Sequence, residues 1–124
     1  MKTFLTVAAT AAMLLGTFPA AAQRRPVNPF NERLRRLPVD QQRSVLRRAV
    51  LDSGQRCKQI GSVAYQAPYK NLEMWTVGCA SAGNYAVFLG LDQSVQVRPC
   101  GDLAGLRLPL CRPLPPAPPV RRRR

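Results

Sequence analysis

The fold is decided by residues 73–100, which read EMWTVGCASAGNYAVFLGLDQSVQVRPC. Apolar and aromatic residues dominate three runs of this stretch, and small or polar residues separate the runs, a pattern typical of β-strands joined by tight turns. The runs predict strands near residues 73–80, 84–91 and 94–100, and a run before them predicts a first strand near 59–66. Because the connections are short, we expect an antiparallel meander.

The positions of the turns predict which side chains share a face of this sheet. We expect the second and third turns to be centred at residues 82–83 and 92–93. This register pairs Phe88 with Val77 on one side and with Val97 on the other, and the face that contains them is the better core. The predicted core face carries Trp75, Val77, Cys79, Ala86, Phe88, Val95 and Val97.

The opposite face is mixed in character and carries Met74, Thr76, Tyr85, Val87, Leu89, Gln96 and Arg98. Three of these residues, Tyr85, Val87 and Leu89, form a candidate protein-binding face, since an exposed apolar patch marks an interaction site. The other interpretation is that they pack under a loop or under the C-terminal tail.

Two helices are expected before the sheet. Asn28 followed by Pro29 is typical of a helix start, and Pro38 ends this short helix. A second helix is expected from about residue 40 to 53, and Gly54 is a natural residue to follow its end. Its apolar side chains fall on one arc, so it can cover a sheet. The sequence therefore predicts an α+β fold, with one or two N-terminal helices packed on a three- to four-stranded antiparallel sheet.

The four cysteines predict two disulfides, because an even count in a small exported chain is typical of a disulfide framework. A zinc site is the alternative, but the chain has no C-x-x-C pair. In the predicted register Cys79 and Cys100 lie at one end of the sheet on opposite faces, which is too far apart for a bridge. Our first choice is Cys57–Cys79 with Cys100–Cys111, and the second is Cys57–Cys100 with Cys79–Cys111.

Residues 1–22 have the features of a signal peptide. A lysine is followed by an uncharged, Ala- and Leu-rich run over residues 4–15, and small residues at Ala20 and Ala22 predict cleavage before Gln23. The alternative is an uncleaved anchor, but the apolar run is shorter than the about 20 residues of a spanning helix. We therefore expect a bacterial periplasmic or secreted protein.

Positive charge is concentrated at both ends of the mature chain, whose net charge is +12. Residues 23–56 carry a net +6, residues 57–100 a net +1 and residues 101–124 a net +5. We divide the mature chain into a basic lead with a short helix (23–38), a disulfide-stapled α+β domain (39–111) and a disordered Pro/Arg-rich tail (112–124).

The basic residues are the main functional signal. If the two helical segments are continuous, three arginines of the helices fall close together on one arc, and four consecutive arginines close the chain. We predict that these seven residues bind a polyanion: Arg36, Arg43, Arg47, Arg121, Arg122, Arg123 and Arg124. In the envelope the available polyanions are lipid head groups, lipopolysaccharide and wall polymers, and an acidic protein is a further candidate partner. Nucleic acid is an unfavourable partner, because export removes it and aromatic residues are sparse near the arginines.

Catalysis and cofactor binding are not expected. The chain has no histidine, which excludes imidazole bases and histidine metal ligands. The six acidic residues form no recognisable catalytic group in the predicted fold, and no metal or catalytic residue is assigned. The sequence thus predicts a non-catalytic exported protein that associates electrostatically with anionic envelope components. The alternative is a periplasmic protein–protein interaction or inhibitor module that uses the sheet surface.

Overall fold

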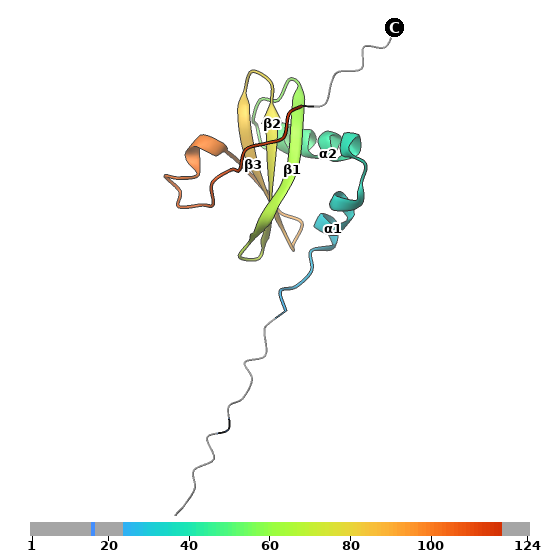
Figure 1. Ribbon diagram of the computed structural model, residues 1–124, viewed down its shortest axis with the longest axis vertical. Helices are drawn as coiled ribbons and strands as arrows, with labels where there is room; N and C mark the ends of the chain where they lie inside the picture. Colours follow the sequence, from blue (N-terminus) through green and yellow to red (C-terminus); the bar gives the residue numbers. More distant parts are fainter. Residues whose placement is uncertain (1–15, 17–23, 118–124) are drawn as a thin grey trace, which may run out of the picture.

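Two helices cover one face of a four-stranded antiparallel sheet in the computed structural model, which describes Gly16 and residues 24–117 (Figure 1). The predicted signal peptide, apart from Gly16, lies outside the described residues, as does the arginine run at the end of the chain. In chain order the elements are α1 (Pro29–Arg36), α2 (Val39–Asp52), β1 (Ile60–Tyr69), β2 (Leu72–Cys79), β3 (Gly83–Gly90), β4 (Val95–Pro99) and the 3-10 turn η1 (Cys100–Asp102).

The start of α1 follows the sequence prediction and also ties the helix to the sheet. Asn28 is the N-cap, and its Oδ1 accepts hydrogen bonds from the backbone N–H groups of Phe30 and Asn31, both at 3.1 Å. The same side chain is buried, and its Nδ2 donates to the carbonyls of Leu89 (3.3 Å) and Gly90 (3.1 Å) at the end of β3. Asn28 therefore satisfies four backbone groups from two layers.

This double role predicts that Asn28→Asp is not a conservative change. Aspartate is as good an N-cap as asparagine in an ordinary helix. Here it would replace the donating amide with an oxygen that faces two carbonyls. We expect Asn28→Asp to lower the free energy of unfolding by about 1–3 kcal/mol, at least as much as Asn28→Ala. Urea denaturation of the three proteins measures this, and equal stability of the Asp variant and the wild type would contradict it.

The second helix ends where the sequence predicted. Ser53 is the C-cap of α2, and Gly54 follows with a φ of +79°, a left-handed conformation that glycine adopts without strain. Leu46 and Val50 are fully buried against the sheet. Helix α1 contributes Leu34 to the same core, so the structural domain begins before residue 39, the boundary that the sequence suggested.

The sheet is the predicted meander, with strand order β1-β2-β3-β4. The register of β3 differs from the prediction, however. Val77 pairs with Tyr85 rather than Phe88, and Val97 pairs with Val87. The physical reason is that both flanking turns hold three residues, with left-handed Ser81 and Gln93 in them. An odd number of loop residues reverses which side chains of β3 face the helices.

The reversal of β3 corrects the predicted faces. Strands β2 and β4 keep Trp75, Val77, Cys79 and Val97 in the core against the helices. Val95, which we also predicted for the core, is 41% exposed and lies outside it. Strand β3 instead adds Tyr85, Val87 and Leu89, which are 5%, 0% and 2% exposed. They are therefore core residues under α1 and α2 and do not form the protein-binding face that we predicted, nor do they pack under the tail.

The other face of β3 is also covered. Ala86 and Phe88 form a second buried cluster with Met74 of β2 and with Leu103, which follows η1. The segment after β4 thus folds back over the outer face of the sheet. Helices, sheet and this C-terminal segment form three layers (Figure 1), and β3 is buried on both sides.

The disulfides are the predicted first choice, Cys57–Cys79 and Cys100–Cys111. The first joins the loop after α2 to the end of β2, on the helix side of the sheet. The second closes the segment that covers the outer face, since Cys111 packs against the cluster around Leu103. Each covering layer is therefore tied to the sheet by one disulfide.

Candidate functional site

The described domain carries a strong excess of positive charge, with fourteen Lys and Arg against six Asp and Glu in residues 24–117. Most of the acids are engaged locally. Four of them form ion pairs: Arg25–Glu73 (3.8 Å), Arg35–Glu32 (3.8 Å), Arg43–Asp40 (3.6 Å) and Arg48–Asp52 (3.0 Å). A fifth, Asp92, accepts a hydrogen bond from the N–H of Ser94 (3.1 Å) in the β3–β4 turn. Hydrogen bonds from Ser94 also hold the pKa of Asp92 below its usual value.

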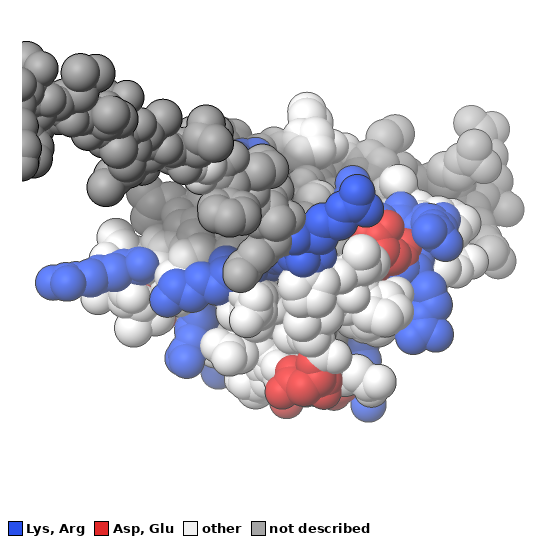
Figure 2. Space-filling model, turned by 90° about the horizontal axis from the view of Figure 1, so that it is seen from below, with Lys and Arg blue, Asp and Glu red and all other residues white. Residues whose placement is uncertain are grey.

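Nine basic side chains are exposed and have no ion-pair partner among the described residues. Two lie on α1, one lies on β4 and the other six lie in connecting or terminal segments: Arg24, Arg33, Arg36, Arg56, Lys58, Lys70, Arg98, Arg107 and Arg112. Figure 2 shows one end of the domain, where blue side chains are spread around the margin and red ones form two small groups. The positive charge is thus a property of the surface as a whole and not of one pocket.

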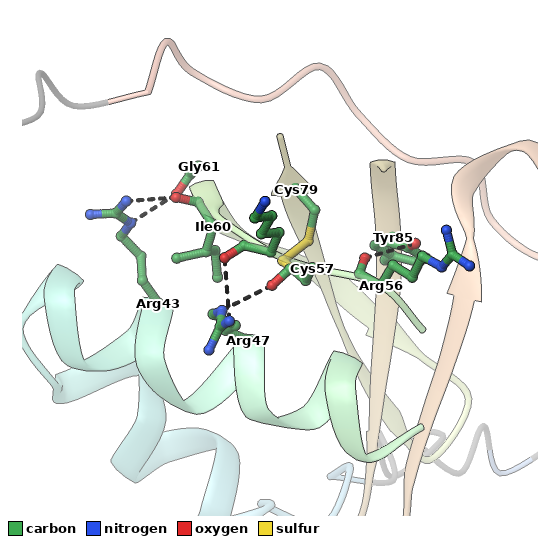
Figure 3. Close-up of a disulfide and its surroundings, with 9 residues drawn as sticks. Arg43, Arg47, Arg56, Cys57, Ile60, Gly61, Cys79 and Tyr85 are labelled. Carbon is green, nitrogen blue, oxygen red and sulfur yellow. Dashed lines mark hydrogen bonds between the residues drawn. A yellow bond between two sulfur atoms is a disulfide. The ribbon is translucent and has the colours of Figure 1, made fainter. Parts of the chain in front are cut away.

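Two of the predicted polyanion-binding arginines are used to hold the fold together. The guanidinium of Arg43 donates to the carbonyls of Gly61 and Ile60, both at 2.8 Å. That of Arg47 donates to the carbonyls of Cys57 (2.9 Å) and Lys58 (3.3 Å). In Figure 3 both side chains rise from α2 toward the start of β1, beside the Cys57–Cys79 disulfide.

Arg43 and Arg47 therefore have a structural role that we did not predict, and their part in a polyanion site stays a prediction. Strand β1 is an edge strand, so its outward carbonyls have no strand partner. Arg43 supplies donors to two carbonyls at the start of this strand, through charge-assisted hydrogen bonds. Arg47 does the same for two carbonyls of the loop that precedes β1. Both guanidinium groups face the protein backbone, although both residues remain partly exposed.

Arg36 is separate from these two. Helix α1 ends at Arg36, and Leu37 and Pro38 break the chain before α2 begins at Val39. The two helical segments are not continuous, so the arc that would join Arg36 to Arg43 and Arg47 does not form. Arg36 is exposed, and no acid of the described domain pairs with it.

The other four residues of the predicted polyanion site form the arginine run that closes the chain. These four residues come after residue 117, where the described part of the chain ends. The prediction for these residues therefore stays a prediction, and it concerns Arg121, Arg122, Arg123 and Arg124, all of which lie outside the described residues.

A polar cluster at the end of β1 and β2 is the most unusual arrangement of titratable groups. The Tyr65 hydroxyl donates to Glu73 Oε2 at 2.6 Å, and Arg25 lies 3.8 Å from the other carboxylate oxygen of Glu73. Arg25 also donates to the carbonyl of Leu72, and the guanidinium of Arg35 lies 4.4 Å from the centre of the Tyr65 ring. Sequence reasoning missed this cluster, because Glu73 is a strand-end residue with no distinctive motif.

The cluster links the segment before α1 to the sheet through Glu73, Arg25 and Tyr65. Burial, and then the hydrogen bond to Glu73 and its negative charge, raise the pKa of Tyr65 to about 12. A phenol with this pKa holds its proton at neutral pH, whereas a general base needs a pKa near the working pH. The contacts fix the residues before α1 against the end of the sheet.

We predict that Tyr65 makes the stability of the domain fall in strong alkali. An unfolded tyrosine loses its proton near pH 10, whereas folded Tyr65 holds it until about pH 12. Its contribution is fully present below pH 10 and is lost as the pH rises through 12. Denaturant unfolding across this range measures the slope. Tyr65→Phe should flatten part of it, and an unchanged slope in that variant would contradict the assignment.

The described part of the chain contains no group of side chains that could bind a metal ion and no free cysteine. No three His, Cys, Asp or Glu side chains of residues 24–117 could share a metal ion, and all four cysteines are in disulfides. Within the same residues no helix is long and apolar enough to span a membrane.

The outer face of β1 and β2 carries the last described residues, 112–117, which we call the strap. They form no helix or strand but are held by the side chain of Gln66, whose Nε2 donates to the carbonyl of Leu110 (2.7 Å). Gln66 Oε1 accepts from the backbone N–H of Arg112 (3.0 Å) and from the hydroxyl of Thr76 (2.7 Å). The sequence analysis assigned residues 112–117 to a disordered tail, whereas the structure has them in contact with the sheet.

The strap has a second point of attachment nearer its end. The hydroxyl of Ser62 donates to the carbonyl of Pro115 at 2.6 Å. The side chain of Leu114 lies over Gly78, where an added Cβ would come within 3.0 Å of Leu114 Cδ1. Between these contacts the strap and the two strands enclose a pocket of about 180 Å³.

The described surface therefore offers two candidate features, a dispersed positive charge and an outer face covered by a proline-rich segment. Comparison with known proteins assigns no function to either of them. The chain matches no family model, and no curated protein or solved structure shows a significant similarity to it.

Proposed function

We propose that the protein is an exported, non-catalytic binding protein that associates with anionic components of the bacterial envelope through its surface charge. The observation that carries the proposal is the uneven pairing of charges. Four of six acids form ion pairs with arginines, while nine exposed basic side chains have no ion-pair partner among the described residues. Each such side chain near an anionic membrane contributes about 1 kcal/mol at low screening.

The distribution of these charges favours a surface over a small ligand as the partner. A bound small anion needs several donors that converge in a cleft. The nine basic side chains instead lie on α1, the loops, β4 and the strap, with exposed Arg33 and Arg36 close together on α1. Phosphate groups of lipid head groups and of lipopolysaccharide offer an extended array of the same chemistry.

Export supports the choice of partner. The two disulfides persist in an oxidising compartment such as the periplasm, and residues 1–22 have the pattern of a signal peptide. N-terminal sequencing of the protein from the periplasmic fraction would test this, with Gln23 expected as the first residue.

The proposed function is tested by binding of the mature protein to vesicles with and without an anionic phospholipid, at low and high salt. We expect binding only to the anionic vesicles, and loss of binding at high salt because exposed charges are screened. Binding to neutral vesicles, or binding that salt does not weaken, would contradict the proposal.

Matched variants separate charge from folding. Arg33→Gln with Arg36→Gln should weaken vesicle binding by about tenfold to thirtyfold without changing stability, since neither side chain makes a hydrogen bond or ion pair within the described domain. Arg33→Lys with Arg36→Lys keeps the charge and should bind as the wild type does. Arg43→Gln with Arg47→Gln should instead lower the free energy of unfolding.

The contribution of the chain end is measured separately. A variant with four glutamines in place of Arg121, Arg122, Arg123 and Arg124 removes four of the charges and leaves the described domain unchanged. We expect it to bind the anionic vesicles more weakly than the wild type, because adjacent charges near an anionic surface each add to the attraction. Unchanged binding would remove these four residues from the proposed polyanion site.

A further inference from the structure

The strap lies on the outer face of the sheet in the way that an extended peptide lies on a receptor. The strap lies across β1 and β2 on the side away from the helices (Figure 1). It donates one backbone N–H, at Arg112, to a side chain of the sheet and accepts at one carbonyl, at Pro115, from another. Both sheet residues, Gln66 and Ser62, lie on β1. Polar side chains that satisfy the backbone of a segment without a strand partner are typical of peptide recognition.

The floor of this groove is shaped for one apolar side chain. Gly61 and Gly78 lie side by side across the two strands, since a Cβ on Gly61 would lie 3.4 Å from the Gly78 carbonyl oxygen. Because neither position has a side chain, Leu114 can pack directly against Gly78, and Ala117 can approach Gly61. Glycine at position 78 therefore allows the side chain of Leu114 to approach the strand closely. It is not needed for an unusual backbone conformation, because the φ of Gly78 is not positive.

The strap is nevertheless the least buried part of the outer layer. Leu114 is half-buried, and the other five strap residues are exposed. The cover over β2 and β3, by contrast, is anchored by fully buried Leu103 and closed by the Cys100–Cys111 disulfide. Segments with few buried contacts open at small free-energy cost, so the strap can leave while the rest of the outer layer stays in place.

We propose that the groove formed by Ser62, Gln66, Thr76, Gly61 and Gly78 is a binding site for an extended proline-containing peptide of a partner protein. The strap is the intramolecular competitor that occupies the site in the free protein. The ligand has a residue with a free N–H, then proline, then a medium-sized apolar residue followed by proline, the pattern of Arg112–Pro115. The strap also uses one charged side chain, since Arg112 Nη1 donates to the Gln66 carbonyl at 3.3 Å. The backbone hydrogen bonds and the apolar contact of Leu114 do not involve charge, so a ligand without this arginine tests them separately from the surface charge invoked above.

The test uses the full mature chain and an uncharged, end-capped hexapeptide, Ala-Pro-Leu-Pro-Pro-Ala, which is residues 112–117 with Arg112→Ala. Binding is followed at high salt by NMR, through the amide signals of Ser62, Gln66 and Gly78. A Leu114→Ser chain frees the groove by removing the anchor of the strap. A second chain carries both Leu114→Ser and Gly78→Ala, so that the added methyl group fills the space over Gly78 that the leucine of the peptide needs. Circular dichroism and the dispersion of the remaining amide signals confirm that each variant is folded.

We expect saturable shifts at these three amides in the Leu114→Ser chain, and binding to the wild type weaker by about tenfold or more. A short tether places the strap at an effective concentration in the millimolar range, which the peptide must exceed. In the chain that also carries Gly78→Ala, the shifts at Ser62 and Gln66 should be absent. The peptide with Ser in place of Leu should not produce shifts in the Leu114→Ser chain. Absence of binding to the Leu114→Ser chain, equal binding to both chains, or shifts elsewhere would overturn the proposal. Because the peptide is uncharged and the salt is high, none of these results bears on envelope binding.

Discussion

Replacing Leu89 by Asp is expected to unfold the domain. Leu89 is 2% exposed and packs in the core between the sheet and the helices. Loss of a buried leucine costs about 2–5 kcal/mol, and a carboxylate placed there would have no cation or donor to compensate its burial. The sum reaches the whole stability of a typical small domain, about 5–15 kcal/mol. Circular dichroism and urea denaturation of Leu89→Asp measure the effect.

The matched control lies two residues further along the chain. Leu91 is in the β3–β4 turn and is 41% exposed, so Leu91→Asp makes the same chemical change without burying it. We expect this variant to fold with a stability within about 1 kcal/mol of the wild type. A folded Leu89→Asp protein would mean that the predicted register, with Leu89 on the outer side of β3, was correct after all.

The faces of the sheet show where sequence reasoning succeeds and where it fails. Alternation along β2 and β4 placed Trp75 and Val97 correctly, because the period of a strand is a local property. The relation between strands depends on the number of residues in each turn. Nothing in Ser81 or Gln93 predicts a positive φ, since glycine and asparagine are the residues that favour it. One residue more or less in a turn exchanges the two faces, so the reversal affected β3 alone. Val95 of β4 lies on the predicted face but is 41% exposed.

The helix start and the disulfides could be predicted for a similar reason. Asn28 and Pro29 act within one helical turn. The cysteine pairing required that Cys79 and Cys100 lie on opposite faces and that Cys57 enter the first strand at the same end as Cys79, and the error in β3 changed neither condition. Polar contacts between residues far apart in the chain could not be predicted from the sequence. The indole N–H of buried Trp75 donates to Asn31 Oδ1 at 2.8 Å, and no pattern in the sequence joins two residues 44 positions apart.

The basic residues illustrate the same limit at the candidate site. Arg36, Arg43 and Arg47 are equivalent by spacing, but their surroundings differ. Arg43 lies beside carbonyls of the edge strand β1 and Arg47 beside carbonyls of the loop before it, whereas Arg36 has no such acceptor. The difference depends on how α2 sits over the start of β1. Composition therefore predicted the excess of charge, whereas the structure is needed to separate the arginines that stabilise the fold from those that are available to a partner.

Removal of the Cys57–Cys79 disulfide is expected to have the second large effect. Loop-closure entropy alone assigns about 3.4 kcal/mol to a bridge between residues 22 apart and about 2.8 kcal/mol to one between residues 11 apart. Cys57 is fully buried and Cys79 nearly so, so Cys57→Ala with Cys79→Ala also leaves a void in the main core. We expect this pair to lower the free energy of unfolding by more than Cys100→Ala with Cys111→Ala, as measured by urea denaturation.

The two losses should also differ in kind. The Cys57–Cys79 bridge joins the end of β2 to the loop after α2, next to the carbonyls that Arg47 holds, so its loss weakens the attachment of the helical layer and the whole domain. The Cys100–Cys111 bridge closes only the outer cover. Its loss should speed hydrogen exchange at the Leu108 amide, which donates to the Leu103 carbonyl at 3.0 Å, while amides of β2 and β3 remain protected. Equal losses of stability, or global unfolding without Cys100–Cys111, would mean that the outer segment is an integral part of the core and not a cover added to it.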